Sequence, residues 1–272
     1  MPILHAIVLG ITQGLSEFLP ISSSGHLRLV PWLFSWDDFA GNESLEKTFD
    51  VALHLGTLIG AVAYFRRDIL RYLKAGFSPS QKGTQDFRLA WLLVASTIPA
   101  AITGALFSDV IERKTGYIWL IATMLIVFGL VLGWADRRTG TRSVDEVTPR
   151  DALLMGIGQA VALQPGVSRS GVTMTAGRIG GLGREGAARF AFLMSLPITA
   201  GALVFKAADA FADGGIPDGF VAPFMWGIVA SGVTGWVAVW GTLRIIKTRS
   251  FTPFVIYRVV VGIGALAIYT IR

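Results

Sequence analysis

Residues 20–26 read Pro-Ile-Ser-Ser-Ser-Gly-His, and residues 165–171 read Pro-Gly-Val-Ser-Arg-Ser-Gly. Both runs interrupt long apolar stretches in a chain whose mean hydropathy is +0.59. Hydroxyl and backbone groups at membrane depth have no water as a partner, so irregular polar segments persist there only where they line a cavity or bind a ligand. Two related runs in one chain therefore predict a paired polar site inside a membrane protein.

The composition indicates an integral membrane protein. Of the 272 residues, 53% are hydrophobic and only 15% are charged, whereas charged residues make up about 25% of a typical soluble domain. The net charge of +6 does not indicate nucleic-acid binding, because the Lys and Arg residues cluster in short loops between apolar runs, as membrane topology requires. The chain has no cysteine, which excludes disulfides, thiolate catalysis and cysteine-ligated metals.

Six apolar runs have the length that a membrane-crossing helix needs, about 20 residues. These predicted spans are 48–65, 89–107, 117–135, 187–206, 220–243 and 252–271. The shorter apolar stretches around the polar runs suit two re-entrant helical hairpins, formed by 1–19 with 24–36 and by 151–164 with 172–182. The predicted fold is an all-α integral membrane protein, with residues 1–272 in a single membrane domain.

Basic residues predict the orientation of the spans, because loops rich in Lys and Arg stay in the cytoplasm. The loop between the first two spans carries Arg66, Arg67, Arg71, Lys74, Lys82 and Arg88, and the connection after the third span carries Arg137, Arg138, Arg142 and Arg150. The opposite loops are poorer in basic residues: 108–116 has only Arg113 and Lys114, and 207–219 has Asp209, Asp213 and Asp218 with none. We therefore expect the first hairpin to enter from the outer face and the second from the cytoplasmic face.

The two halves of the chain are related in sequence. The matching residues, all at an offset of 146, are Gln13 with Gln159, Ser22 with Ser168, Ser24 with Ser170, and Gly25 with Gly171. Together with the opposite entry sides, this similarity predicts inverted-topology repeats over about 1–135 and 150–272, joined by a cytoplasmic loop at 136–149. Because inverted repeats with broken helices are also a transporter plan, the symmetry alone does not indicate catalysis.

The first polar run brings together groups that suit catalysis. Glu17 lies just before the turn at Pro20, and as a carboxylate at membrane depth it is a candidate for metal binding or proton transfer, with an interhelical hydrogen bond as the structural alternative. One serine suffices to cap the following helix, so three serines leave spare hydroxyls, and Ser22 is a candidate for binding phosphate. His26 is a candidate acid, base or nucleophile.

The second polar run suits the binding of a tetrahedral oxyanion. Arg169 offers a forked guanidinium, and Ser168, Ser170 and Thr173 add hydroxyl donors. Arg169 could instead form a structural ion pair with Glu17, and both roles can coexist in a resting site. Each polar run also opens a short helix, so two helix N-termini would present N–H groups to a phosphate or diphosphate.

Other polar signals carry less information. The Gly-x-Gly-x-x-Gly pattern at Gly181, Gly183 and Gly186 follows no strand, which argues against a nucleotide site. His54 and Arg258 are polar residues inside predicted spans; Arg258 could bind phosphate or pair structurally, and His54 could serve either purpose.

Residues 13–26, from Gln13 to His26, and residues 165–173, from Pro165 to Thr173, together resemble the undecaprenyl-diphosphate phosphatases, also called the bacitracin-resistance family. The resemblance extends to the segments 48–57 and 251–258. It implies hydrolysis of undecaprenyl diphosphate to undecaprenyl phosphate and inorganic phosphate, which recycles the lipid carrier for peptidoglycan synthesis. It also implies bacitracin resistance, a divalent cation (Mg²⁺ or Ca²⁺) and a multi-pass protein of the bacterial cytoplasmic (inner) membrane.

The resemblance also implies roles for individual residues. Ser23 matches the proposed nucleophile, with His26 assisting, while Glu17 holds a metal or activates Ser23. Arg169 grips phosphate, and Ser168 and Thr173 bind its oxygens. The position of Gln13 is Glu or Gln in the family, so Glu17 is the only carboxylate of this motif and Gln13 is the second candidate metal ligand.

Several alternatives stay open at the level of sequence. His26 itself could attack phosphorus, as in the acid phosphatases whose Ser-Gly-His motif resembles residues 24–26, although their Lys-rich, Arg-Pro first motif is absent. A lipid-carrier flippase or transporter is the alternative to an enzyme. The oligomeric state is open, with a homodimer as one alternative. From the entry side of the first hairpin, we expect the active site to open to the outer, periplasmic face.

Overall fold

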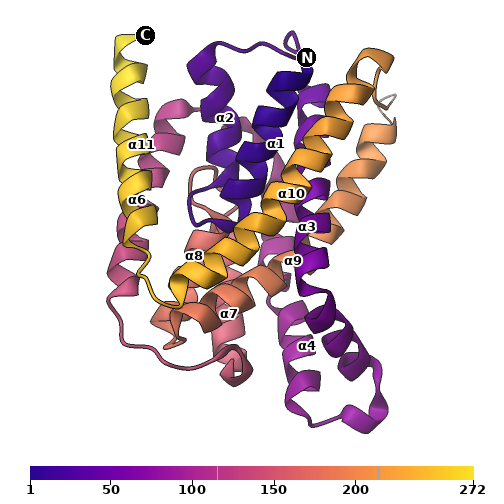
Figure 1. Ribbon diagram of the computed structural model, residues 1–272, viewed down its shortest axis with the longest axis vertical. Helices are drawn as coiled ribbons and strands as arrows, with labels where there is room; N and C mark the ends of the chain where they lie inside the picture. The colour runs from indigo at the N-terminus through magenta and orange to yellow at the C-terminus, as the bar shows by residue number, and fades with distance from the viewer. Residues whose placement is uncertain (115, 213–214) are drawn as a thin grey trace.

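In a computed structural model of the protein, the described chain is built from helices (Figure 1). The structure describes residues 1–114, 116–212 and 215–272, and all their side chains except those of 108–114 and 207–212. The α-helices are α1 (Ile3–Phe18), α2 (Ser23–Phe34), α3 (Glu43–Phe77), α4 (Gln85–Ala95), α5 (Ile98–Lys114), α6 (Ile118–Asp136), α7 (Pro149–Val161), α8 (Arg169–Ile179), α9 (Arg184–Ala212), α10 (Val221–Ile246) and α11 (Thr252–Ile271).

The six predicted spans are confirmed as helices long and apolar enough to cross a membrane. Within the described residues these are Glu43–Phe77, Gln85–Phe107, Ile118–Asp136, Arg184–Lys206, Asp218–Ile246 and Thr252–Ile271. The second of them joins α4 to most of α5. Six charged residues of the two expected outward loops lie outside the described side chains: Asp109, Glu112, Arg113, Lys114, Asp209 and Asp213.

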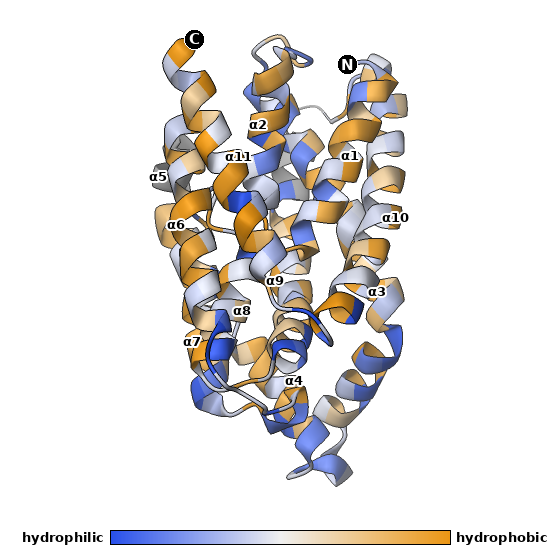
Figure 2. Ribbon diagram, turned by 60° about the vertical axis from the view of Figure 1, so that its left-hand side comes forward, coloured by the Kyte–Doolittle hydropathy of each residue, from blue (hydrophilic) through white to orange (hydrophobic). Residues whose placement is uncertain are grey.

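Helices α3, α6 and α11 run lengthwise and α10 crosses obliquely, and both chain termini lie at the same end (Figure 1). Helices α1 and α2 lie at that end. The connections from α3 to α4 and from α6 to α7 lie at the opposite end, where Figure 2 shows hydrophilic residues gathered. We call this opposite end the basic end, because those two connections and the adjoining ends of α3, α4 and α7 carry the arginines and lysines that predict a cytoplasmic face.

Both polar runs break the helical chain, and they do so with the same backbone shape. Ser22, before α2, has φ 79° and ψ 96°, and Ser168, before α8, has φ 75° and ψ 111°. The Ser22 hydroxyl accepts a hydrogen bond from the Gly25 N–H (3.4 Å), and the Ser168 hydroxyl accepts one from the Gly171 N–H (3.1 Å). A positive φ at a residue other than glycine costs on the order of 1–3 kcal/mol and is concentrated at functional sites.

Small residues let α1 pack closely on α10, and α10 on α3. A Cβ added at Gly14 of α1 would lie 2.6 Å from the carbonyl oxygen of Ser231, and one added at Gly60 of α3 would lie 2.3 Å from that of Gly232. Such spacing of small residues allows backbones to approach within a membrane, where lipid offers no hydrophobic driving force for helix association. This packing fixes the end of α1 that carries Glu17.

Arg258 of α11 is fully buried and connects both breaks. Its guanidinium donates to the carbonyl oxygen of Pro20 in the first break (3.2 Å) and to those of Gly166 (3.0 Å) and Val167 (2.9 Å) in the second. It also donates to two carbonyl oxygens of α6, those of Met124 and Leu125. Of the two roles that the sequence leaves open for Arg258, these contacts support the structural one.

The loop between α6 and α7 is held by arginine contacts at the basic end. Arg142 forms a two-pronged hydrogen bond with Asp151 (2.7 and 2.9 Å), which raises the pKa of the Arg142 guanidinium above its ordinary value. Asp151 also receives the Thr148 N–H in a capping box that starts α7. These contacts fix the start of α7, the helix that leads into the second break.

We predict that Arg258→Met destabilises the protein strongly, because it leaves several buried carbonyl groups without donors. Each buried carbonyl oxygen that loses its donor costs about 1–3 kcal/mol, and the loss is read as a lower unfolding temperature of the detergent-purified protein. Arg137→Met, which changes an exposed arginine at the basic end, is the matched control and should behave like the parent. Equal unfolding temperatures for the two variants would contradict this role of Arg258.

Candidate active site

The two breaks meet in space. The Ser170 hydroxyl of the second break donates to the carbonyl oxygen of Leu19 in the first (3.1 Å), and Arg169 forms an ion pair with Glu17. The residues predicted from the two polar runs therefore belong to one constellation, although about 150 positions separate them in the chain.

Glu17 lies at the centre of this constellation, with its side chain 5% exposed. Its Oε2 atom accepts from the Ser23 hydroxyl at 2.6 Å and from the Gln13 side-chain amide at 3.0 Å, while Oε1 accepts from Arg169. The His54 Nε2 atom lies 3.7 Å from Oε2. A buried carboxylate with this many donors is stabilised in its charged form.

Ser23 combines access with a neighbouring base. It is partly exposed, whereas Ser22 beside it is buried. A hydroxyl is activated as a nucleophile by a base within hydrogen-bond reach, about 2.6–3.2 Å, and Glu17 meets that criterion. Arg169 and His54 are also partly exposed, so three groups around one buried carboxylate are accessible from outside.

Arg169 is held by two partners at once. One of its terminal nitrogens binds Glu17, and the other donates to the Thr199 hydroxyl of α9 at 2.8 Å. The ion pair that the sequence suggested between Arg169 and Glu17 is thus present, and it does not exclude phosphate binding. A guanidinium fixed on two sides is oriented for a tetrahedral oxyanion.

His26 is not bonded to Ser23. Its Nδ1 atom lies 2.8 Å from the carbonyl oxygen of Ser22, and its Nε2 atom lies 2.8 Å from the Tyr257 hydroxyl. Because a carbonyl oxygen only accepts, Nδ1 carries the proton and a neutral His26 accepts from Tyr257. The imidazole thus binds the Ser22 carbonyl group of the first break. Attack by Nε2 on phosphorus would require the hydrogen bond to Tyr257 to break.

The remaining predicted phosphate ligands already have hydrogen-bond partners, Ser170 at Leu19 and the other three within or at the start of their own helices. Ser22 and Ser168 cap α2 and α8, as described above. Their hydroxyls also lie near those of Ser24 (3.5 Å) and Ser170 (3.4 Å). The Thr173 hydroxyl donates to the carbonyl oxygen of Arg169 at 2.7 Å. Phosphate binding by the side chains of Ser22, Ser168, Ser170 and Thr173 stays a prediction.

Gln13 offers one oxygen for a divalent cation. Its Oε1 atom is buried without a hydrogen-bond partner among the described residues, while its Nε2 atom binds Glu17. Amide and carboxylate oxygens are suitable ligands for Mg²⁺ and Ca²⁺. Within the part of the chain that the structure describes, no group of three or more His, Cys, Asp and Glu side chains could hold a metal.

Sequence reasoning missed two partners and left a third without a role. Tyr257 and Thr199 carry only weak signals, a single hydroxyl in an apolar helix. His54 was noted as a polar residue in a span, but nothing in the sequence places it near Glu17. Contacts between distant helices leave no pattern in a single sequence, so these three residues could be found only in the fold.

Comparison with known proteins identifies the family. The family model described as bacitracin resistance protein BacA matches residues 6–264. A Pelobacter propionicus protein named undecaprenyl-diphosphatase is 48% identical over 267 residues, covering 96% of this chain and 95% of that protein. Proteins of the same name from Geobacter sulfurreducens (47% over 272 residues, 98% of each chain) and Pelotomaculum thermopropionicum (45% over 273 residues, 100% of this chain and 98% of that one) are similar throughout. The chain belongs to the BacA family of bacitracin resistance proteins.

Proposed function

We propose that this protein hydrolyses undecaprenyl diphosphate to undecaprenyl phosphate and inorganic phosphate, and so recycles the lipid carrier for peptidoglycan synthesis and contributes to bacitracin resistance. The names of the relatives support the substrate. The observation that carries the chemistry is the 2.6 Å hydrogen bond from the Ser23 hydroxyl to Glu17. The transporter alternative is not proposed, because these relatives are named as hydrolases.

In the proposed reaction, the Ser23 oxygen attacks the terminal phosphorus while its proton passes to Glu17. The bond from that phosphorus to the bridging oxygen breaks, and undecaprenyl phosphate leaves. The proton on Glu17 passes to the leaving oxygen of undecaprenyl phosphate, which restores the carboxylate. Water then attacks the phosphoserine and gives a proton to Glu17, and the bond from phosphorus to the Ser23 oxygen breaks. That oxygen takes the proton from Glu17, so inorganic phosphate is released and the Ser23 hydroxyl is restored. The occupied nitrogens of His26 favour Ser23 over His26 as the nucleophile.

Arg169 is proposed to bind the transferred phosphoryl group. The developing negative charge is spread over its oxygens, so catalysis depends mainly on positioning and electrostatic stabilisation. Helices α2 and α8 begin at this site, so the positive ends of their dipoles also stabilise negative charge on the phosphoryl group. The Thr199 contact keeps one side of the guanidinium oriented when the other side exchanges Glu17 for phosphate.

Glu17 and Gln13 are proposed to hold a divalent cation, Mg²⁺ or Ca²⁺, together with substrate oxygens. Such a cation would neutralise charge on the diphosphate. The support is that the buried Oε1 atom of Gln13 has no hydrogen-bond partner among the described residues, while the Nε2 atom of the same side chain binds Glu17. Mg²⁺ is commonly bound through one or two carboxylates and substrate phosphates. One carboxylate, from Glu17, and one amide oxygen, from Gln13, are consistent with such a site.

The site is proposed to open to the outer face of the bacterial cytoplasmic membrane. The support is that α1 and α2 lie at the end away from the basic end (Figure 1), which the positive-inside rule assigns to the cytoplasm. We further propose that α1 with α2 and α7 with α8 are re-entrant hairpins of inverted repeats. The common backbone shape at Ser22 and Ser168 supports the repeat.

We predict that Ser23→Ala lowers the rate of phosphate release on the order of 10³-fold or more, because loss of a nucleophile removes the covalent route. The assay uses purified protein and undecaprenyl diphosphate with Mg²⁺ or Ca²⁺. Ser24→Ala, at the neighbouring hydroxyl, is the control and should lose less than about tenfold, a far smaller loss than that of a nucleophile. Full activity of Ser23→Ala would exclude Ser23 as the nucleophile.

We predict that Arg169→Ala lowers turnover about 10²-fold or more, comparable to removing an oxyanion donor. Thr199→Val keeps the guanidinium and removes only one neutral hydrogen bond, so its loss should stay below about tenfold. Steady-state phosphate release checks both variants. Near-normal turnover of Arg169→Ala would leave Arg169 a structural partner of Glu17.

We predict that Gln13→Glu lowers the Mg²⁺ or Ca²⁺ concentration needed for half-maximal activity, because it adds a second carboxylate beside Glu17. Gln13→Leu should raise that concentration. Gln159→Leu changes the matching glutamine of the second half, which is also buried and without a hydrogen-bond partner among the described residues, and should leave it unchanged. An identical metal requirement in all three variants would exclude Gln13 as a ligand.

A further inference from the structure

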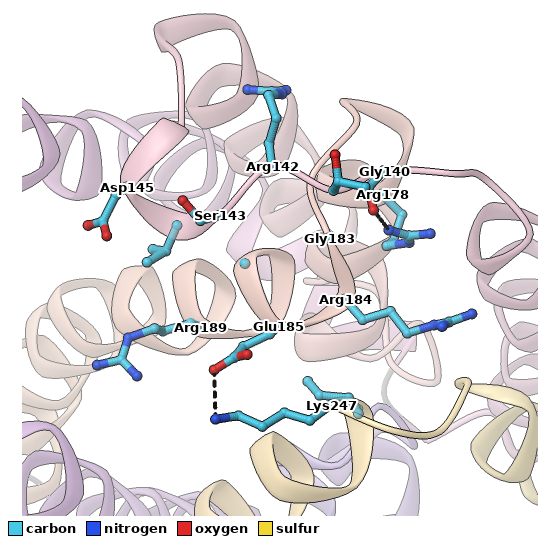
Figure 3. A pocket seen from close by; sticks show the side chains of 14 residues that line it. Gly140, Arg142, Ser143, Asp145, Arg178, Gly183, Arg184, Glu185, Arg189 and Lys247 are labelled. Atoms are coloured by element: carbon cyan, nitrogen blue, oxygen red, sulfur yellow. Dashed lines mark hydrogen bonds and ion pairs between the residues drawn. The ribbon is translucent and has the colours of Figure 1, made fainter.

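A second polar feature lies at the basic end, away from the catalytic constellation. A hollow of about 360 Å³ lies between α3, the start of α9 and the end of α10. At Glu185, Arg189 and Lys247 it adjoins a larger hollow of about 670 Å³. Figure 3 shows the larger one, with Lys247 and Glu185 reaching toward one another across its edge.

Arg244 gives the smaller hollow an unbalanced positive charge. Two other cations there are paired, Arg189 with Asp68 (2.7 Å) and Lys247 with Glu185 (3.2 Å). Arg244 is exposed, and in the part of the chain that the structure describes it forms no ion pair. Its guanidinium instead lies over the Trp240 ring, 5.6 Å from the ring centroid. Among the described residues, the hollow thus holds an oriented cation that has no counter-ion.

An aromatic stripe leads from the lipid-facing surface to this cation. Trp236, Trp240 and Arg244 are four residues apart, so they lie on one face of α10. Trp236 and Trp240 are 41% and 45% exposed, and Tyr64 of α3 packs against Trp236 with ring centroids 6.2 Å apart. Trp and Tyr are enriched at the level of lipid headgroups, with basic residues just beyond.

We propose that these residues form a binding site for the phosphate of an anionic phospholipid in the leaflet at the basic end. Arg244 binds the phosphate, and Lys247 adds a second donor when it exchanges Glu185 for the lipid. The acyl chains lie along Trp236 and Trp240. Basic pockets between helices on the cytoplasmic side of membrane proteins are suited to anionic headgroups. The site does not depend on the hydrolytic reaction.

The test measures lipid retention rather than activity, so its outcome is independent of the proposed function. Purified protein is placed in phosphatidylcholine nanodiscs that contain a fraction of phosphatidylglycerol, and bound phosphatidylglycerol is counted by native mass spectrometry. We expect Arg244→Gln to weaken its binding about fivefold, the effect of one basic residue at an anionic surface. Trp240→Leu should weaken it as well.

Arg138→Gln is the matched control. Arg138 also lies over a tryptophan at the basic end, with its guanidinium 4.7 Å from the Trp134 ring centroid, but it lines neither of the two hollows. Retention that falls in Arg244→Gln and not in Arg138→Gln supports the site, and equal retention in both overturns it.

A separate arm distinguishes a lipid from free phosphate. Inorganic phosphate is titrated against protein in nanodiscs of phosphatidylcholine alone and, as a competitor, against bound phosphatidylglycerol. Binding of inorganic phosphate that depends on Arg244 and displaces the lipid at millimolar concentration would assign the site to a soluble anion and overturn the lipid proposal. Failure to compete supports it. Unchanged unfolding temperatures of the Arg244 and Trp240 variants show that lost binding does not reflect lost folding.

Discussion

The rest of the molecule depends on the hydrogen bonds that the buried guanidinium of Arg258 donates to backbone carbonyl groups. Two breaks in helical structure leave backbone carbonyl groups without partners, and the interior of a membrane offers no water to replace them. An arginine carries five N–H donors in a fixed plane, and Arg258 directs them to carbonyl oxygens of both breaks and of α6. The breaks can therefore keep the shapes that place Glu17 against Ser23 and Arg169.

The buried carboxylate of the candidate active site needs polar partners for the same reason. Moving a carboxylate out of water costs several kcal/mol unless other groups compensate. Glu17 meets this requirement with Arg169, Ser23 and Gln13, and each of these is also a candidate for the reaction. In the proposed reaction, stability of the resting site and readiness for an anionic substrate come from the same contacts, because the substrate phosphate would replace the carboxylate as the partner of Arg169.

Much of the fold could be predicted because hydrophobicity along a helix is local information. The six spans follow from runs of apolar residues, and the last predicted span, 252–271, has the same bounds as α11. The sequence also predicts a serine cap for the helix after the first break, and Ser22 is that cap. Ser168, which caps α8, is predicted from the sequence as a phosphate ligand and not as a cap. By contrast, the partners of Arg258, the Tyr257 contact of His26 and the proximity of His54 to Glu17 depend on how distant helices pack. The sequence shows that such polar residues are unusual in an apolar span, but it does not show which residues they contact.

The Arg258 contacts also set an order of assembly during synthesis. The carbonyl group of Pro20 and the guanidinium that binds it are 238 residues apart. At about 5–20 residues per second, the ribosome adds Arg258 on the order of tens of seconds after Pro20. Until then the first break exists in a nascent chain without its final donor, so water, lipid headgroups or the insertion machinery must satisfy its carbonyls. Helix α11 therefore completes a structure that α1 begins.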